Sequence, residues 1–201
     1  SHHYAMHPLL VSGHDAYATP LGNLEVDREG VEAISAYLKM QSGLSITPVH
    51  QDHEHAIEIQ IPFLQRIYTH DYRFVPIMIA DQSMPIIDLL AKGIADLFKD
   101  VSTLLIASTD LSHFFPEGEA NRLDQNMLNA MMSFSTKDMY LLEQTGEGSA
   151  CGVGAAAAVL EISKRWGANQ AQMLGYATSG KVTGDKSSVV GYGTILFSAD
   201  K

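Results

Sequence analysis

Residues 101–113 read V-S-T-L-L-I-A-S-T-D-L-S-H, and this stretch decides which fold the sequence favours. Its first part is rich in aliphatic and β-branched residues, a pattern typical of a β-strand buried on both faces. We therefore expect Leu104, Leu105 and Ile106 to lie in a central strand. The polar part that follows holds a carboxylate, Asp110, and an imidazole, His113. Because ligands of open α/β sheets bind beyond the carboxyl ends of the strands, we expect chemistry at these two residues.

Length and composition limit the classes of protein to which the chain can belong. Its 201 residues suit one α/β domain with a substantial core, so we predict a single domain over residues 1–201. The net charge of −10 argues against nucleic acid and anionic membranes as partners. One cysteine, Cys151, permits no intrachain disulfide, and no segment resembles a signal peptide or a membrane span. We therefore expect a cytoplasmic protein.

Strands and helices are predicted to alternate along most of the chain. Apolar residues at helical spacing predict helices over residues 27–40, 55–68, 84–98, 120–134, 138–144 and 150–165. Strands are predicted over residues 72–80, 101–107, 172–177 and 188–197, with short edge strands over 24–27 and 46–49. Residues 1–18 show turn signals and little periodicity, so no strand is expected there. The alternation indicates an α/β fold, with a mainly parallel or mixed central sheet and helices on both faces.

Several side chains could bind a metal or move a proton. Two histidines with an anion are a common ligand set for a redox metal that has open coordination positions. The pair His53-x-His55 could chelate a metal, although a charged surface turn is the simpler interpretation. Cys151 is either a buried core residue or a thiolate ligand at the start of a helix. Asp110 either caps a turn or takes part in chemistry, and His113 suits a general base. The sequence contains no G-x-S-x-G, Walker or Rossmann motif, and a Ser-His-Asp arrangement stays open.

Several short blocks, in order along the chain, carry a resemblance to a known family. They are Ser1-His2-His3, Thr19-Pro20-Leu21-Gly22, Glu54-His55 with Ile57-Glu58 and Pro62-Phe63-Leu64, Ser108-Thr109-Asp110-Leu111-Ser112-His113, Ala150-Cys151-Gly152, Tyr176-Ala177-Thr178-Ser179-Gly180, and Val189-Val190-Gly191-Tyr192. Together they resemble the Memo family, whose prokaryotic members are called AmmeMemoRadiSam system protein B. The blocks span the whole chain, and their shared order is more specific than any one of them.

The resemblance implies a fold and a metal site. The Memo family is similar in fold to class III extradiol dioxygenases, which use mononuclear non-haem iron. A His, His, Cys set stands at the equivalent metal site of Memo proteins, and this assigns His2 and Cys151 as metal ligands in the present chain. The same resemblance gives His113, in one block with Asp110, the position of an acid/base residue near the metal.

A further block of the family, which contains Glu54 and His55, lies near the same cleft, so both residues join the catalytic candidates. The family's first ligand belongs to a P-H-A-G-Y block, which these 201 residues do not contain. We therefore expect that the chain lacks an N-terminal segment and that its metal site is impaired, because two ligands bind iron weakly. The residues expected to line one cleft are His2, Glu54, Asp110, His113 and Cys151.

Three functions are compatible with these residues. The leading hypothesis is a metal-dependent redox or dioxygenase-like protein that holds iron or copper; zinc is also an option, because thiolate and imidazole suit all three metals. The second is a non-catalytic peptide-binding module, since the resemblance extends to Memo-like proteins of animals that are linked to peptide binding in receptor signalling. The third is a zinc-dependent hydrolase with His113 as its base. The expected partner is a small molecule or a peptide, and the sequence sets neither the substrate nor the oligomeric state.

Overall fold

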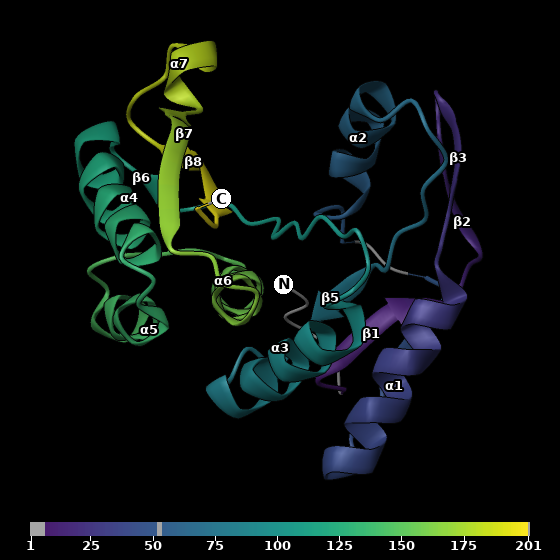
Figure 1. Ribbon diagram of the computed structural model, residues 1–201. Helices are drawn as coiled ribbons and strands as arrows, with labels where there is room; N and C mark the ends of the chain where they lie inside the picture. Colours follow the sequence, from purple (N-terminus) through teal and green to yellow (C-terminus); the bar gives the residue numbers. More distant parts are fainter. Residues whose placement is uncertain (1–6, 52–53, 201) are drawn as a thin grey trace. The chain divides into compact units, whose positions relative to one another are not determined.

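The computed structural model describes residues 7–51 and 54–200 (Figure 1). The chain forms two compact units, Ser1–Ser102 and Thr103–Lys201. Helices and strands occur in both units. The α/β class that the sequence indicates is therefore confirmed.

Strand β1 (Leu9–Ser12) lies at the centre of the first unit, and all 4 of its residues are buried. It pairs with β4 (Thr47–Val49) in parallel and with β5 (Ile77–Ile79) in antiparallel orientation. Strands β2 (Ala16–Thr19) and β3 (Gly22–Glu25) form a separate antiparallel hairpin. The expectation that residues 1–18 contain no strand is wrong, because strands of 4 residues are too short to show a period in the sequence.

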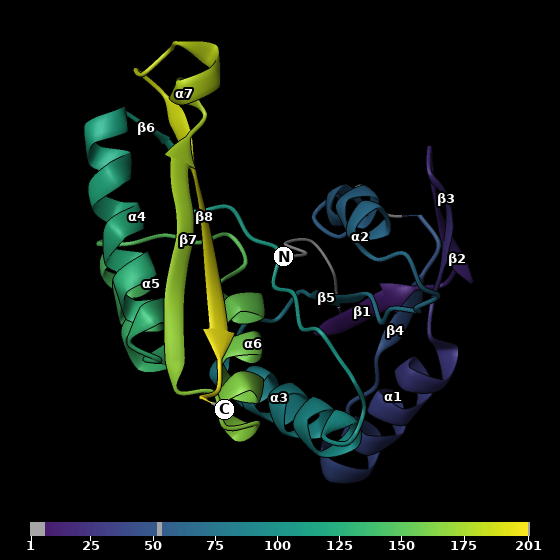
Figure 2. The same ribbon diagram turned by 45° about the horizontal axis from the view of Figure 1, so that its top comes forward.

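The helices of the first unit begin and end where local signals place them. Helix α1 (Arg28–Ser42) begins after Asp27, whose side chain accepts a hydrogen bond from the Gly30 N–H, and it ends at Gly43 in the left-handed conformation. Helix α3 (Met84–Phe98) has the predicted bounds, and it packs against α1 (Figure 2). The predicted helix over residues 55–68 is shorter: a 3₁₀ turn, η1 (Glu58–Gln60), leads into α2 (Ile61–Ile67). Pro62 is accommodated in the first turn of α2, where its missing N–H breaks no hydrogen bond.

The second unit is built on an antiparallel sheet with the strand order β6-β8-β7. Its strands are β6 (His113–Phe115), β7 (Gln170–Thr178) and β8 (Val189–Ser198). Its helices are α4 (Glu117–Met132), α5 (Thr136–Thr145), α6 (Val153–Arg165) and the short α7 (Gly180–Thr183). Helices α4 and α6 lie on opposite faces of the long β7–β8 pair (Figures 1 and 2). Within this unit, the predicted placement of helices on both faces of a sheet is observed.

The predicted central strand over residues 101–107 is the main error. No described strand pairs with this segment, and the side chains of Leu104 and Ile106 are 58% and 46% exposed. Of the two expected arrangements, mainly parallel and mixed, the sheet of the first unit is mixed, and β1–β4 is the one parallel pair among the named strands of the described residues. An apolar run favours burial, but a buried strand also needs a neighbour that satisfies its N–H and C=O groups. The sequence of the run does not contain that information.

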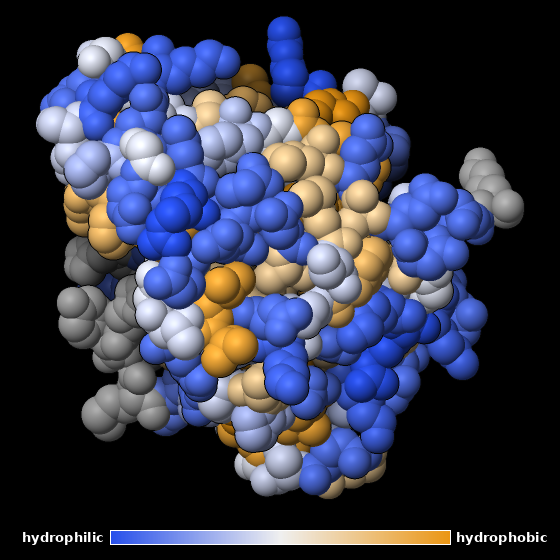
Figure 3. Space-filling view, turned by 90° about the vertical axis from the view of Figure 1, so that its left-hand side faces the viewer, coloured by the Kyte–Doolittle hydropathy of each residue, from blue (hydrophilic) through white to orange (hydrophobic). Residues whose placement is uncertain are grey.

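The surface and the helix lengths agree with the composition. Figure 3 views the molecule from the side on which α4 and α5 lie in Figure 1, and hydrophilic residues cover most of this face. Hydrophobic residues appear there as a band across the upper part of the face and as smaller groups below it. Among the helices of the described ranges, none has both the length and the apolar composition that crossing a membrane requires.

Candidate metal centre

Three of the predicted site residues converge in the second unit. One possible ligand atom each from Asp110, His113 and Cys151 lies within 4.8 Å of the other two. Asp110 comes from the segment that leads into β6, His113 is the first residue of that strand, and Cys151 comes from the turn before α6. All three are half-buried, so they are held by the protein and are still reachable from solvent. Within residues 7–51 and 54–200, no other three His, Cys, Asp or Glu side chains converge in this way.

Hydrogen bonds join the Cys151 turn to the Asp110 segment. The Cys151 N–H donates to the Asp110 carbonyl at 3.1 Å, and the Asp110 N–H donates to the Cys151 Sγ at 3.3 Å. Thr109 adds a second link: its hydroxyl donates to the Asp110 carbonyl at 2.8 Å and accepts from the Gly152 N–H at 2.7 Å. These bonds fix the sulfur beside the carboxylate. The thiolate is the form of a cysteine that binds metals.

Gly152 permits this close approach of the two segments. A Cβ atom at this position would lie 2.9 Å from the Thr109 Cβ and 3.0 Å from the Ser108 carbonyl oxygen. No side chain fits there without moving the backbone that carries Asp110. Sequence reasoning missed the role of Thr109, although its place in the same family block as Asp110 and His113 was a signal.

The imidazole of His113 has an unusual environment. Its Nε2 atom is buried and has no hydrogen-bond partner among the described residues, yet it lies 3.5 Å from the Asp110 Oδ2. This distance brings the two groups into ion-pair range without forming a hydrogen bond. A buried polar atom without a partner is costly, and a metal ion or a substrate atom would satisfy it.

The strand that follows carries local strain. Phe114 has a φ of 65°, which is uncommon for a bulky residue, and the β6–β8 register shifts between His113 and Phe115. Such strain persists where the surrounding structure imposes it, and it is frequent at functional sites. Tyr192 of β8 lies near this segment: burial raises the pKa of its hydroxyl, and the negative charge of Asp110 raises the pKa further.

The donor set fits a transition metal. A thiolate, an imidazole and a carboxylate are ligands of iron, copper and zinc, whereas calcium and magnesium prefer oxygen alone. The unpartnered Nε2 of His113 is the observation in this structure that supports the fit. The identity of the metal does not follow from the donors.

The other predicted site residues are His2, Glu54 and His55. His2 lies outside the described residues. Glu54 and His55 belong to the first unit, where one Glu54 oxygen accepts hydrogen bonds from the N–H groups of His55 at 2.9 Å and Ala56 at 3.0 Å. The His55 ring is exposed, and its Nδ1 lies 3.2 Å from the Glu58 Oε2. Within the second unit, the structure brings together Asp110, His113 and Cys151.

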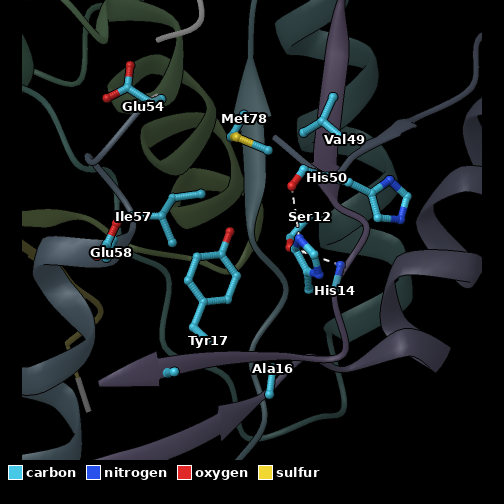
Figure 4. A pocket seen from close by; sticks show the side chains of 11 residues that line it. Ser12, His14, Ala16, Tyr17, Val49, His50, Glu54, Ile57, Glu58 and Met78 are labelled. Carbon is cyan, nitrogen blue, oxygen red and sulfur yellow. Dashed lines mark hydrogen bonds between the residues drawn. The ribbon is translucent and has the colours of Figure 1, made fainter. Parts of the chain in front are cut away.

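Glu54 lines a cavity of about 310 Å³ within the first unit (Figure 4). In Figure 4 the Tyr17 hydroxyl points toward the middle of the side chains that surround this cavity. The surrounding side chains include Ser12, His14, Tyr17, His50, Ile57, Glu58 and Met78. The His14 Nε2 forms a hydrogen bond of 2.9 Å with the His50 carbonyl, so this nitrogen carries the proton. Polar and apolar groups thus share the lining.

Comparisons with known proteins agree on one family. A family model described as Memo-like protein matches residues 1–196. A MEMO1 family protein of Nitrosopumilus maritimus is 33% identical over 181 residues, which cover 90% of this chain and 65% of that protein. A MEMO1 family protein of Methanopyrus kandleri is 34% identical over 184 residues, which cover 90% of this chain and 64% of that protein. A MEMO1 family protein of Archaeoglobus fulgidus is 36% identical over 193 residues, which cover 94% of this chain and 70% of that protein. The chain thus spans just under two thirds of the length of the first two relatives.

Proposed function

The chain belongs to the Memo-like protein family, and on this premise we propose that it holds one transition-metal ion at Asp110, His113 and Cys151 for redox chemistry on a small molecule. The observation that carries the proposal is the convergence of three different ligand types within 4.8 Å. The unpartnered Nε2 of His113 supports it further. Neither observation depends on residues outside the second unit.

Each of the three residues has a distinct part in the proposed site. Cys151 supplies a thiolate whose position is fixed by the Asp110 N–H, and the carboxylate of Asp110 adds a second negative charge. His113 presents Nε2 as a neutral donor atom. Iron or copper bound there supplies one-electron and dioxygen chemistry, whereas zinc supplies a Lewis acid.

The proposal is tested first by metal analysis of the full-length protein. The protein is loaded anaerobically with iron(II), copper(I) or zinc, and bound metal is measured for wild type, Cys151→Ser and His113→Gln. We expect Cys151→Ser to weaken binding at least about 100-fold, since loss of an outer partner alone costs 10- to 100-fold in metal sites. The change is nearly isosteric, so circular dichroism should show an intact fold. His70→Gln, which changes an exposed histidine of the first unit, is the matched control for His113→Gln.

A second measurement addresses the reaction class. Oxygen consumption by the metal-loaded protein with catechols would support dioxygenase-like chemistry, and we expect Cys151→Ser to abolish it. Unchanged metal stoichiometry in Cys151→Ser would contradict the ligand role and leave Cys151 as a core residue. Full-length protein that folds normally and binds none of the three metals would instead favour the peptide-binding hypothesis.

A further inference from the structure

Asp124 is a buried carboxylate in the second unit that lies outside the proposed metal site. It belongs to helix α4, and it is 0% exposed. Its Oδ1 accepts a hydrogen bond from the backbone N–H of Ser112 at 2.8 Å. Its Oδ2 accepts a hydrogen bond from the Tyr176 hydroxyl at 2.7 Å. One side chain thus joins α4, strand β7 and the segment that carries Asp110 and His113.

The burial of this carboxylate needs an explanation. No Lys, Arg or His in the part of the chain that the structure describes forms an ion pair with Asp124, and its two hydrogen bonds come from a peptide N–H and a phenol. Burying a charged group with neutral partners alone is costly unless the hydrogen bonds are well formed. Burial and the hydrogen bond to Asp124 raise the pKa of Tyr176, which keeps its hydroxyl protonated as a donor at neutral pH. The two hydrogen bonds of Asp124 are therefore maintained at neutral pH. Because burying a carboxylate among neutral partners is unfavourable, we infer that Asp124 has a role besides packing.

The backbone around Ser112 is also held by β8. The Leu111 N–H donates to the Gly191 carbonyl at 2.9 Å, and the Gly191 N–H donates to the Ser112 carbonyl at 3.0 Å. Asp124 approaches so closely that a Cβ atom on Gly191 would lie 1.8 Å from its Oδ2. The backbone of Ser112 is thus held at both of its polar groups, at its N–H by the Asp124 carboxylate and at its carbonyl by the Gly191 N–H. His113 is the next residue, and Asp110 lies two residues earlier.

We propose that Asp124 is a positioning residue, which fixes the Ser112 peptide and thereby sets where the side chains of Asp110 and His113 lie. The proposal rests on the proposed metal site for its functional meaning, but the placement of His113 is a property of the protein without metal. Asp124 touches none of the donor atoms. It acts through the backbone of Ser112.

The test compares substitutions of Asp124 with a matched change on the same helix. Asp124→Ala removes the acceptor for Ser112, whereas Asp124→Asn retains an oxygen that can accept the same hydrogen bond. The control is Glu117→Gln, because the Glu117 carboxylate also links α4 to β7, through a 2.9 Å bond from Thr178, and it contacts Lys186 instead of the Ser112 segment. If Asp124→Ala does not fold, Tyr176→Phe serves in its place. It removes one of the two hydrogen bonds to Asp124 and should destabilise the protein less.

Two readouts on the full-length protein separate the proposal from its premise. The first is the position of the His113 imidazole resonances in a long-range nitrogen–proton correlation spectrum of metal-free protein, assigned with His113→Gln. The second is cobalt(II) affinity, followed by thiolate-to-cobalt charge-transfer absorption. We expect Asp124→Ala to shift the His113 resonances and to weaken cobalt binding about 10- to 100-fold. Tyr176→Phe should produce smaller changes in the same direction. Asp124→Asn and Glu117→Gln should resemble wild type in both.

The results test two claims separately: the positioning role of Asp124 and the proposed metal site. His113 resonances that are unchanged in Asp124→Ala, or in Tyr176→Phe when Asp124→Ala does not fold, would overturn the positioning role. An equal shift in Glu117→Gln would also overturn it, because the effect would then come from general loosening of α4. Wild type that binds no cobalt would overturn the proposed metal site, while the His113 resonances would still decide whether Asp124 positions that ring.

Discussion

At the scale of single residues, Gly191 shows how closely the second unit is packed next to the segment that carries Asp110 and His113. A Cβ atom at this position would lie 1.8 Å from the Asp124 Oδ2 and 2.5 Å from its Cγ. We predict that Gly191→Ala lowers the free energy of unfolding by about 1–3 kcal/mol, the usual cost of overpacking a core. Urea denaturation of the full-length protein measures this change.

Gly175 of β7 provides the control for Gly191. It lies in the same ladder, but a Cβ atom at this position would have no heavy atom of another segment within 4 Å. Gly175→Ala should therefore leave the free energy of unfolding unchanged or raise it by up to about 1 kcal/mol, because glycine weakens a strand. Equal destabilisation by the two substitutions would show that the approach of Asp124 to Gly191 is not the cause.

At the scale of elements, helix α5 holds the turn that carries Cys151. The Glu143 carboxylate of α5 accepts a hydrogen bond from the Ala150 N–H, the residue before Cys151. Burial raises the pKa of Glu143 above its ordinary value of 4.5, although hydrogen bonds from Ala150 and Ser149 act in the opposite direction. The folded state therefore binds this proton more tightly than the unfolded state does.

This difference predicts a pH dependence of stability. The contribution of Glu143 is fully present below its unfolded pKa, near 4.5, and it is lost as the pH rises through the raised pKa of the folded state. The free energy of unfolding of wild type, measured relative to that of Glu143→Gln, should thus fall as the pH rises through this window. Above the raised pKa of the folded state, the difference should stay constant. Urea titrations of both proteins across the window measure it. A difference that does not change with pH, or that grows in favour of wild type, would contradict the raised pKa.

At the scale of the whole molecule, residues 104–107 are the point where sequence and structure disagree. The apolar run predicts a buried strand, whereas the structure shows no strand pairing and exposes Leu104 and Ile106. Amides outside a ladder exchange with solvent faster than amides within a stable sheet. We predict that the amides of residues 104–107 exchange much faster than those of residues 191–196 in β8. Hydrogen exchange followed by mass spectrometry of the full-length protein tests this. Equal protection of the two segments would mean that the run is a paired strand, as its sequence favours.

The sequence by itself determined the features that depend on near neighbours along the chain. The bounds of α3 match their prediction, and α1 begins after Asp27 and ends at Gly43 as the caps indicate, because helix signals act within one or two turns. The ordered family blocks likewise identified Asp110, His113 and Cys151 before any geometry was known. The order of the blocks indicates that the three residues belong to one site. Their separation along the sequence does not by itself show that they lie close together.

The tertiary structure alone decided which distant segments meet. It shows that Asp110 and Cys151 exchange hydrogen bonds across 41 positions of the chain, and that Asp124 accepts from the Ser112 N–H. It also shows that β1 is a central strand and that residues 101–107 belong to none of the described strands. The physical reason is the same in each case. Backbone groups and buried carboxylates take whichever partner the whole fold brings within hydrogen-bonding distance, and a local run of residue types does not contain the identity of that partner.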